Sequence, residues 1–129
     1  MIAVALAIAL LSGADAQPVD AAADAALPTA PSLGLQWKRI PDKFLLVKLY
    51  PAAAKTAGVT GAKVDLACTL DAFGSPKCEV YGETNPGLGF GDAAVSYMGK
   101  GQMVIDDGKP IAGRRFRYFV VFGDWKPKA

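Results

Sequence analysis

Apolar and polar side chains alternate over residues 63–70, which is the period of a strand with one buried face. The apolar members of this alternation are Val64, Leu66, Cys68 and Leu70. Residues 71–75 contain Gly74, which can take a positive φ and is typical of a tight turn. Residues 76–83 then alternate again. The pattern predicts a β-hairpin over residues 62–82.

The predicted hairpin places the two cysteines of the chain opposite each other. If Leu70 faces Pro76, then Cys68 faces Cys78. The spacing does not match a CxxC redox motif, and the sequence holds no histidine or third cysteine to complete a zinc site. We therefore favour a Cys68–Cys78 disulfide in an exported protein over a redox pair or part of a metal site.

Further elements are predicted on both sides of the hairpin. Residues 52–55 are strong helix formers, and Gly58 can end that helix. Residues 91–100 predict a helix with one apolar face, and residues 114–122 alternate like a strand. Residues 44–48 are compatible with a helix or a strand. The predicted order is helix, strand, strand, helix, strand.

The N-terminal region predicts export. Residues 2–11 form an uninterrupted apolar run that is too short to span a bilayer as a helix. The following Ala14-Asp15-Ala16 has the small-x-small pattern of a cleavage site, so we expect a signal peptide over residues 1–16. No lysine or arginine precedes the run, so the true start could lie upstream. The alternatives are a buried core helix and an inner-membrane anchor that faces the periplasm.

The remaining domain boundaries follow from composition. Residues 17–35 are rich in Ala and Pro and have no sustained amphipathic period, so we expect a flexible linker. We expect the folded domain over residues 36–123 and a tail over 124–129. The expected location is periplasmic or secreted.

Composition and charge narrow the classes of function. Hydrophobic residues make up 52% of the chain and charged residues 20%, which is typical of a globular protein. The net charge of +2 argues against a nucleic-acid partner. The absence of histidine removes the commonest general base and metal ligand, and with them the usual serine triad. We expect no enzyme, metal, cofactor or small-molecule substrate.

The segment 87–91, Gly-Leu-Gly-Phe-Gly, opens the predicted helix after a strand, so a phosphate-binding loop must be considered. A dinucleotide fingerprint needs its third glycine at the position of Asp92, whose charge would also repel an anion. We interpret the segment as a tight turn before the helix.

In their order and spacing, several short motifs resemble the C-terminal domain of TonB-type energy transducers. They are Tyr50-Pro51 with Ala54, then Gly58 and Gly61, Leu70-Asp71 with Gly74, Phe90-Gly91-x-Ala93-Ala94, and Asp107-Gly108-Lys109-Pro110 before the aromatic last strand. The resemblance covers about two-thirds of the chain, residues 37–122, and the paired cysteines look like a variant branch. It implies an α+β, two-layer ββαβ fold with a three-stranded antiparallel sheet and a leading helix.

The same resemblance implies a periplasmic, non-enzymatic module that binds a short peptide of a TonB-dependent outer-membrane transporter. Coupling to an inner-membrane proton-driven motor is expected only if an anchoring segment lies upstream of Met1. The alternative is a stand-alone structural or interaction protein of the envelope that has this fold and no transporter partner.

In a ββαβ unit, the strand over 114–122 pairs with the first strand and leaves its other edge free. Arg115, Arg117, Phe119 and Val121 then lie on the face away from the helix. We expect an extended peptide to add along this edge, as TonB-type domains bind their partners, with an acidic residue opposite the arginines. The alternative is that these arginines only protect the edge from aggregation.

Overall fold

The computed structural model describes residues 21–127. Its elements are α2 Ala21–Ala25, the 3₁₀ helix η1 Pro31–Leu33, β1 Gln36–Arg39, α3 Leu45–Lys48, α4 Ala52–Thr56, β2 Gly61–Leu70, β3 Pro76–Glu83, α5 Phe90–Met98, β4 Gln102–Val104 and β5 Arg115–Gly123. The predicted signal peptide lies outside the described residues, as does its cleavage site. Within residues 21–127, no helix has the length and apolar character needed to cross a membrane.

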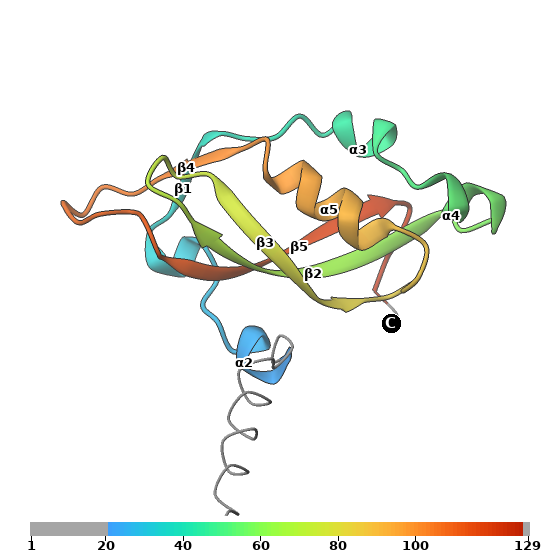
Figure 1. The fold of residues 1–129 in the computed structure, drawn as a ribbon, viewed down its shortest axis with the longest axis horizontal. Coiled ribbons are helices and arrows are strands. Elements are labelled where there is room, and N and C mark those ends of the chain that lie inside the picture. The colour runs from blue at the N-terminus through green and yellow to red at the C-terminus, as the bar shows by residue number, and fades with distance from the viewer. Residues whose placement is uncertain (1–20, 128–129) are drawn as a thin grey trace, which may run out of the picture.

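The architecture is α+β, with helix α5 lying across one face of a three-stranded antiparallel sheet (Figure 1). The strand order is β3-β2-β5, so β2 is the central strand. This confirms the predicted three-stranded sheet, including the antiparallel pairing of the last strand with the first strand of the hairpin. A separate two-stranded sheet, β1-β4, lies beside it.

The hairpin forms in the predicted register. Leu70 lies opposite Pro76, and Cys68 lies opposite Cys78 with their Cα atoms 4.0 Å apart. The two cysteines form a disulfide. Because disulfides persist in oxidising environments, this bond fits a protein that works outside the cytoplasm.

The hairpin turn is stabilised by one carboxylate and one glycine. The Asp71 carboxylate accepts hydrogen bonds from the backbone N–H of Phe73 at 2.8 Å and of Ser75 at 2.9 Å. Gly74 has φ 82°, and a Cβ there would collide with the carbonyl oxygen of Met103. Glycine therefore lets β4 approach the turn, where the Met103 N–H donates to the Gly74 carbonyl at 2.8 Å.

The core lies between α5 and the apolar face of the sheet. Its fully buried large side chains are Val64, Leu66, Cys68, Leu70, Phe90, Met98, Met103, Phe116 and Phe122. Tyr50 packs edge-on against Phe90 with ring centroids 5.2 Å apart, and its hydroxyl donates to the Val59 carbonyl. Burial raises the pKa of Tyr50, and the nearby Asp124 carboxylate adds to the effect. The Tyr-Pro motif thus anchors the segment that leads into α4.

The segment that was compatible with a helix or a strand forms the short helix α3. Asp42 begins it, because its carboxylate accepts the Phe44 N–H at 2.9 Å and its carbonyl accepts the Leu45 N–H. Strands β1 and β4 were not predicted. They have four and three residues, which is too short for the period-two pattern to be distinguished from a loop.

Part of the expected linker has a defined place in the fold. Residues 21–35 contain α2 and η1, and Ala30 and Leu35 are buried in the core. This differs from the flexible segment expected over residues 17–35. The reason is packing. The apolar residues of this segment are too widely spaced for an amphipathic period, yet Ala30 and Leu35 are buried in the core and Leu33 packs against it.

Removing the disulfide should lower stability without removing the fold. In the chain-entropy account, closing the loop between Cys68 and Cys78 contributes about 2–3 kcal/mol to the free energy of unfolding. We expect the double variant Cys68→Ala/Cys78→Ala to lose this amount in urea denaturation while its far-UV circular dichroism stays native. An unchanged urea midpoint would show that the sheet alone fixes the register.

The turn carboxylate should make stability depend on pH. The Ser75 N–H hydrogen bond is the largest of the causes that lower the pKa of Asp71. A lowered folded-state pKa contributes stability above about pH 4, and this contribution disappears as the pH falls through the folded value. We expect Asp71→Asn to unfold at lower urea than the wild type at pH 7, and by a smaller difference at pH 2. Asp106→Asn is the control, and an equal loss at both pH values would contradict the account.

Candidate functional site

The face of the sheet away from α5 carries the candidate site. Along β2, Lys63, Asp65 and Thr69 point to this face while the intervening apolar residues are buried. The register of β5 places Val121 opposite Lys63 and Phe119 opposite Asp65. The alternation that builds the core therefore also builds a polar outer face.

All four predicted site residues lie on β5 and on this face, but they divide into two pairs with different surroundings. Arg115 and Arg117 bind residues 21–35 of the same chain, which we call the N-terminal segment. The Arg115 guanidinium lies 3.5 Å from the buried carboxylate of Asp24 in α2, and its Nε donates to the Thr69 hydroxyl at 3.2 Å. Arg115, which was expected to pair with an acidic residue of a peptide, is therefore already paired with an acid of the chain itself.

Arg117 holds the N-terminal segment against the edge of β5. Its backbone N–H donates to the Pro28 carbonyl and its Nε donates to the Leu27 carbonyl, both at 2.9 Å. Thr29 forms a parallel bridge with Arg117. The segment thus adds to the sheet edge as one short parallel strand.

Pro31 ends this pairing after a single bridge. It starts the 3₁₀ helix η1, and a proline has no N–H to donate to a strand. The chain therefore leaves β5 before it reaches Phe119. Because N–H direction alternates along a strand, the amides of Phe119 and Val121 point to the same free edge as that of Arg117. Within residues 21–127, neither amide has a backbone hydrogen bond beyond the sheet.

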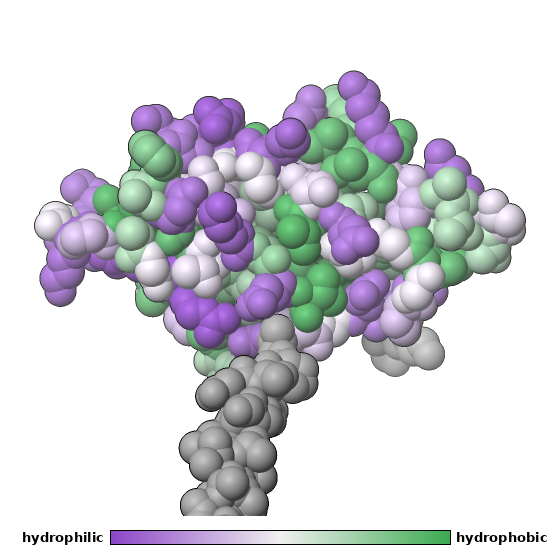
Figure 2. Space-filling view, viewed as in Figure 1, coloured by the Kyte–Doolittle hydropathy of each residue, from purple (hydrophilic) through white to green (hydrophobic). Residues whose placement is uncertain are grey.

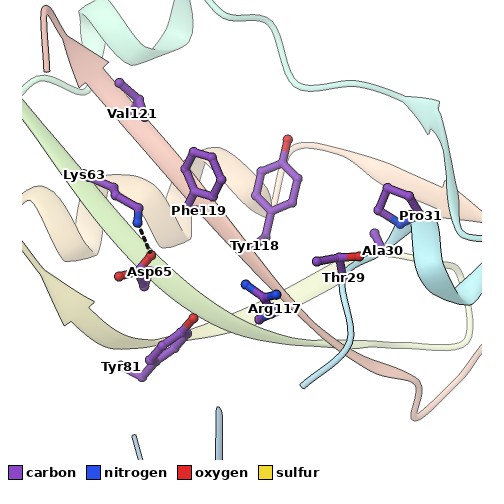
Figure 3. A pocket seen from close by; sticks show the side chains of 10 residues that line it. All are labelled: Thr29, Ala30, Pro31, Lys63, Asp65, Tyr81, Arg117, Tyr118, Phe119 and Val121. Atoms are coloured by element: carbon purple, nitrogen blue, oxygen red, sulfur yellow. Dashed lines mark ion pairs between the residues drawn. The ribbon is translucent and has the colours of Figure 1, made fainter. Parts of the chain in front are cut away.

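A groove opens where the N-terminal segment leaves the edge (Figure 3). It has a volume of about 620 Å³. Its residues come from the N-terminal segment, from all three strands of the sheet and from both faces of β5: Thr29, Ala30, Pro31, Lys63, Asp65, Tyr81, Arg117, Tyr118, Phe119 and Val121. The groove therefore lies over the outer face of the sheet and reaches the open part of the β5 edge.

An ion pair and an exposed aromatic ring line the groove. Lys63 Nζ lies 3.2 Å from the Asp65 carboxylate and 5.0 Å from the centre of the Phe119 ring. The centre of the Trp125 ring, outside the groove lining, lies 5.7 Å from Lys63 Nζ. Phe119 is 54% exposed although it is a large apolar side chain. This combination offers both apolar contact and charge to an extended chain.

Tyr81 contributes a hydroxyl to the groove from β3. Burial raises its pKa, the Asp65 carboxylate adds to this, and a hydrogen bond from Arg117 opposes it. Tyr81 stays protonated at neutral pH and can donate or accept a hydrogen bond. Arg117 lies between Thr29 and Tyr81 in Figure 3.

Lys63, Asp65, Tyr81 and Thr29 were not among the predicted site residues. The sequence pattern could have identified Lys63 and Asp65 as site residues. The alternation of β2 and its predicted pairing with the last strand place them beside Val121 and Phe119. The pairing register of β3 shifts between Asp65 and Leu66, which pattern alone does not reveal. Thr29 is brought there by the N-terminal segment.

The opposite edge of the sheet, on β3, is less suited to adding a strand. It begins with Pro76, carries the charged and exposed Lys77 and Glu79, and has the register shift described above. These are features by which proteins protect a sheet edge from further pairing.

The arrangement of the described residues includes no group of three or more acidic or cysteine side chains that could hold a metal ion.

Loosening Arg117 should release the N-terminal segment. Arg117→Ala removes the bond to the Leu27 carbonyl, and a net hydrogen bond of about 0.5–1.5 kcal/mol corresponds to roughly a twofold to tenfold change in the attached population. We expect thermolysin to cleave before Ala26 faster by this factor, while the melting temperature of the domain changes little. Lys77→Ala is the control on the other edge. Equal cleavage in Arg117→Ala and wild type would show that other contacts hold the segment.

Comparison with known proteins adds no relative to this picture. No protein-family model, curated protein or solved structure matches the chain. The function must therefore be argued from the groove and the edge.

Proposed function

We propose that the domain is a TonB-like module that binds an extended peptide along the open edge of β5, in a two-layer ββαβ unit. The partner is a peptide of a TonB-dependent outer-membrane transporter, and the protein works without catalysis in the periplasm. The proposal combines the sequence resemblance with one structural observation: no described residue pairs with the β5 edge from Phe119 to Val121.

The way the chain binds its own N-terminal segment supports this mode of recognition. At Arg117, an extended segment already joins the edge through main-chain hydrogen bonds. Peptide addition to a sheet edge uses the same bonds, and pockets for alternate side chains supply the preference. Beyond Pro31, the edge offers the same donors and acceptors together with a groove of about 620 Å³.

The side chains around the open edge favour a particular kind of peptide. Phe119 and the half-buried Val121 offer apolar contact. Lys63 can exchange its internal partner, Asp65, for a carboxylate of the peptide, because both side chains are about one-third exposed. We therefore place the acid preference at Lys63 rather than at Arg115 and Arg117, which are engaged internally.

One observation favours the alternative of an envelope protein without a transporter partner. The N-terminal segment covers the edge at Arg117, and covered edges are a common protection against unwanted pairing. In that case the open edge would bind no partner and would only be the end of the sheet. The identity of the partner at Phe119 separates the two functions.

The test uses a photo-crosslinking amino acid in place of Phe119, in the full chain, exposed to outer membranes that contain TonB-dependent transporters. We expect the adduct to contain a transporter, crosslinked through its periplasmic peptide. The synthetic peptide identified in this way should bind Phe119→Pro about tenfold more weakly than wild type, because the edge loses one main-chain donor.

Phe119→Ser is the matched control, since it removes the ring and keeps the N–H. If main-chain bonds carry recognition, it should lose less affinity than Phe119→Pro, with both variants folded by circular dichroism. Equal peptide affinity of wild type and Phe119→Pro would place the site elsewhere. Adducts that contain envelope proteins and never a transporter would favour the alternative function.

A further inference from the structure

Large apolar side chains gather on the surface around α3. Among the described residues, six large apolar side chains are exposed, and three of them lie within residues 40–47. These are Ile40 at 64%, Phe44 at 66% and Val47 at 69% exposure. Single exposed apolar residues are normal, whereas a group of three within eight residues marks an interaction surface.

The local fold presents these side chains to solvent. Leu46 and Leu49 pack against the core, so they fix the inner side of α3. Phe44 and Val47 are three residues apart and share the opposite side of the turn. The Asp42 carboxylate holds the start of the turn through the Phe44 N–H. Figure 2 shows hydrophobic surface over α3 with hydrophilic side chains beside it.

Basic side chains surround this apolar surface. Arg39, Lys48 and Lys100 line a shallow hollow with Ile40 and Phe44. Lys43 Nζ lies 5.9 Å from the centre of the Phe44 ring. The acid that lines the hollow is Asp42, whose carboxylate is engaged by the Phe44 N–H. We call these residues together the α3 patch: Ile40, Phe44 and Val47 with Arg39, Lys43, Lys48 and Lys100.

We propose that the α3 patch docks on an anionic lipid surface. Its three apolar side chains project into the acyl boundary, while the four cations that surround them contact lipid phosphates. This is the division of roles in interfacial helices, which combine an apolar face with flanking Lys and Arg. Lysine and arginine stems also let the charged ends reach the headgroups while the turn lies deeper.

The shape of the patch favours a membrane over an acidic protein. Phe44 and Val47 project from the helical turn and Ile40 from the segment before it. All three side chains are about two-thirds exposed, and the hollow that Ile40 and Phe44 line is shallow. A lipid surface needs no complementary shape. The proposal is independent of peptide binding, since no residue of the α3 patch lines the groove along β5.

A local fluorescent probe tests the proposal on the full chain. Val47→Cys is labelled with an environment-sensitive fluorophore under non-reducing conditions, which leave the Cys68–Cys78 disulfide intact. With vesicles of equal parts phosphatidylcholine and phosphatidylglycerol, we expect a blue shift and a severalfold rise in emission. Because the probe reports its own surroundings, membrane association through another part of the chain does not produce this signal.

Phe73→Cys is the matched control, because Phe73 is also an exposed phenylalanine and lies in the hairpin turn. Its label should show no shift. In the labelled Val47→Cys protein, Lys43→Gln/Lys48→Gln should need roughly 25-fold more anionic lipid for the half-maximal signal, since each lysine near such a surface strengthens binding about fivefold. Lys77→Gln/Lys109→Gln removes two lysines from outside the α3 patch and should behave like the parent.

Several results would overturn the proposal. They are an unshifted label at position 47 with anionic vesicles, an equal shift with pure phosphatidylcholine, and an equal loss in both lysine double variants. If polyglutamate shifts the label at position 47 and anionic vesicles do not, the α3 patch serves an acidic protein and the lipid proposal is wrong.

Discussion

The central strand β2 is the constraint on which the rest of the structure depends. It is paired on both sides, with β3 and β5, and its apolar residues at even positions all face α5. Because side chains alternate with period two, a slip of one residue between β2 and β5 would turn either Leu66 or Phe116 out of the core, and a slip between β2 and β3 would separate Cys68 from Cys78. The Cys68–Cys78 disulfide holds one pairing in place, and the aromatic side chains of β5 hold the other by burial.

The same alternation determines which side chains lie on the outer face of the sheet. Lys63 and Asp65 cannot reach the core in this register, so they stand beside Phe119 and Val121 on the solvent side. Part of that face is used to hold the N-terminal segment, through Asp24 with Arg115 and through the Pro28 and Leu27 carbonyls with Arg117. A peptide on the open edge would lie next to this segment, so the two would share one strand without competing for the same amides.

The sequence was sufficient to predict the hairpin, its cysteine register, the helix α5 and the pairing of the last strand with β2. These elements are long and periodic, and each has a buried face that repeats over several residues. The β1-β4 pair and the docking of residues 21–35 could not be predicted in this way. They depend on single contacts between distant residues, such as Arg117 with Pro28 or Gly74 with Met103, and no local period reports them.

For the peptide binding proposed above, the extent of the open edge sets the length of peptide that would fit. The N-terminal segment stops at Pro31, and the strand itself ends at Gly123, where φ is 59° and the Asp124 N–H turns back to Thr60. The stretch between Tyr118 and Gly123 corresponds to about 17–20 Å at 3.3 Å per residue. It offers outward amides only at alternate positions, beginning with Phe119. Recognition by main-chain bonds is therefore limited to a peptide of about five or six residues, and most of its selectivity must come from the side chains that face Lys63, Asp65 and Phe119.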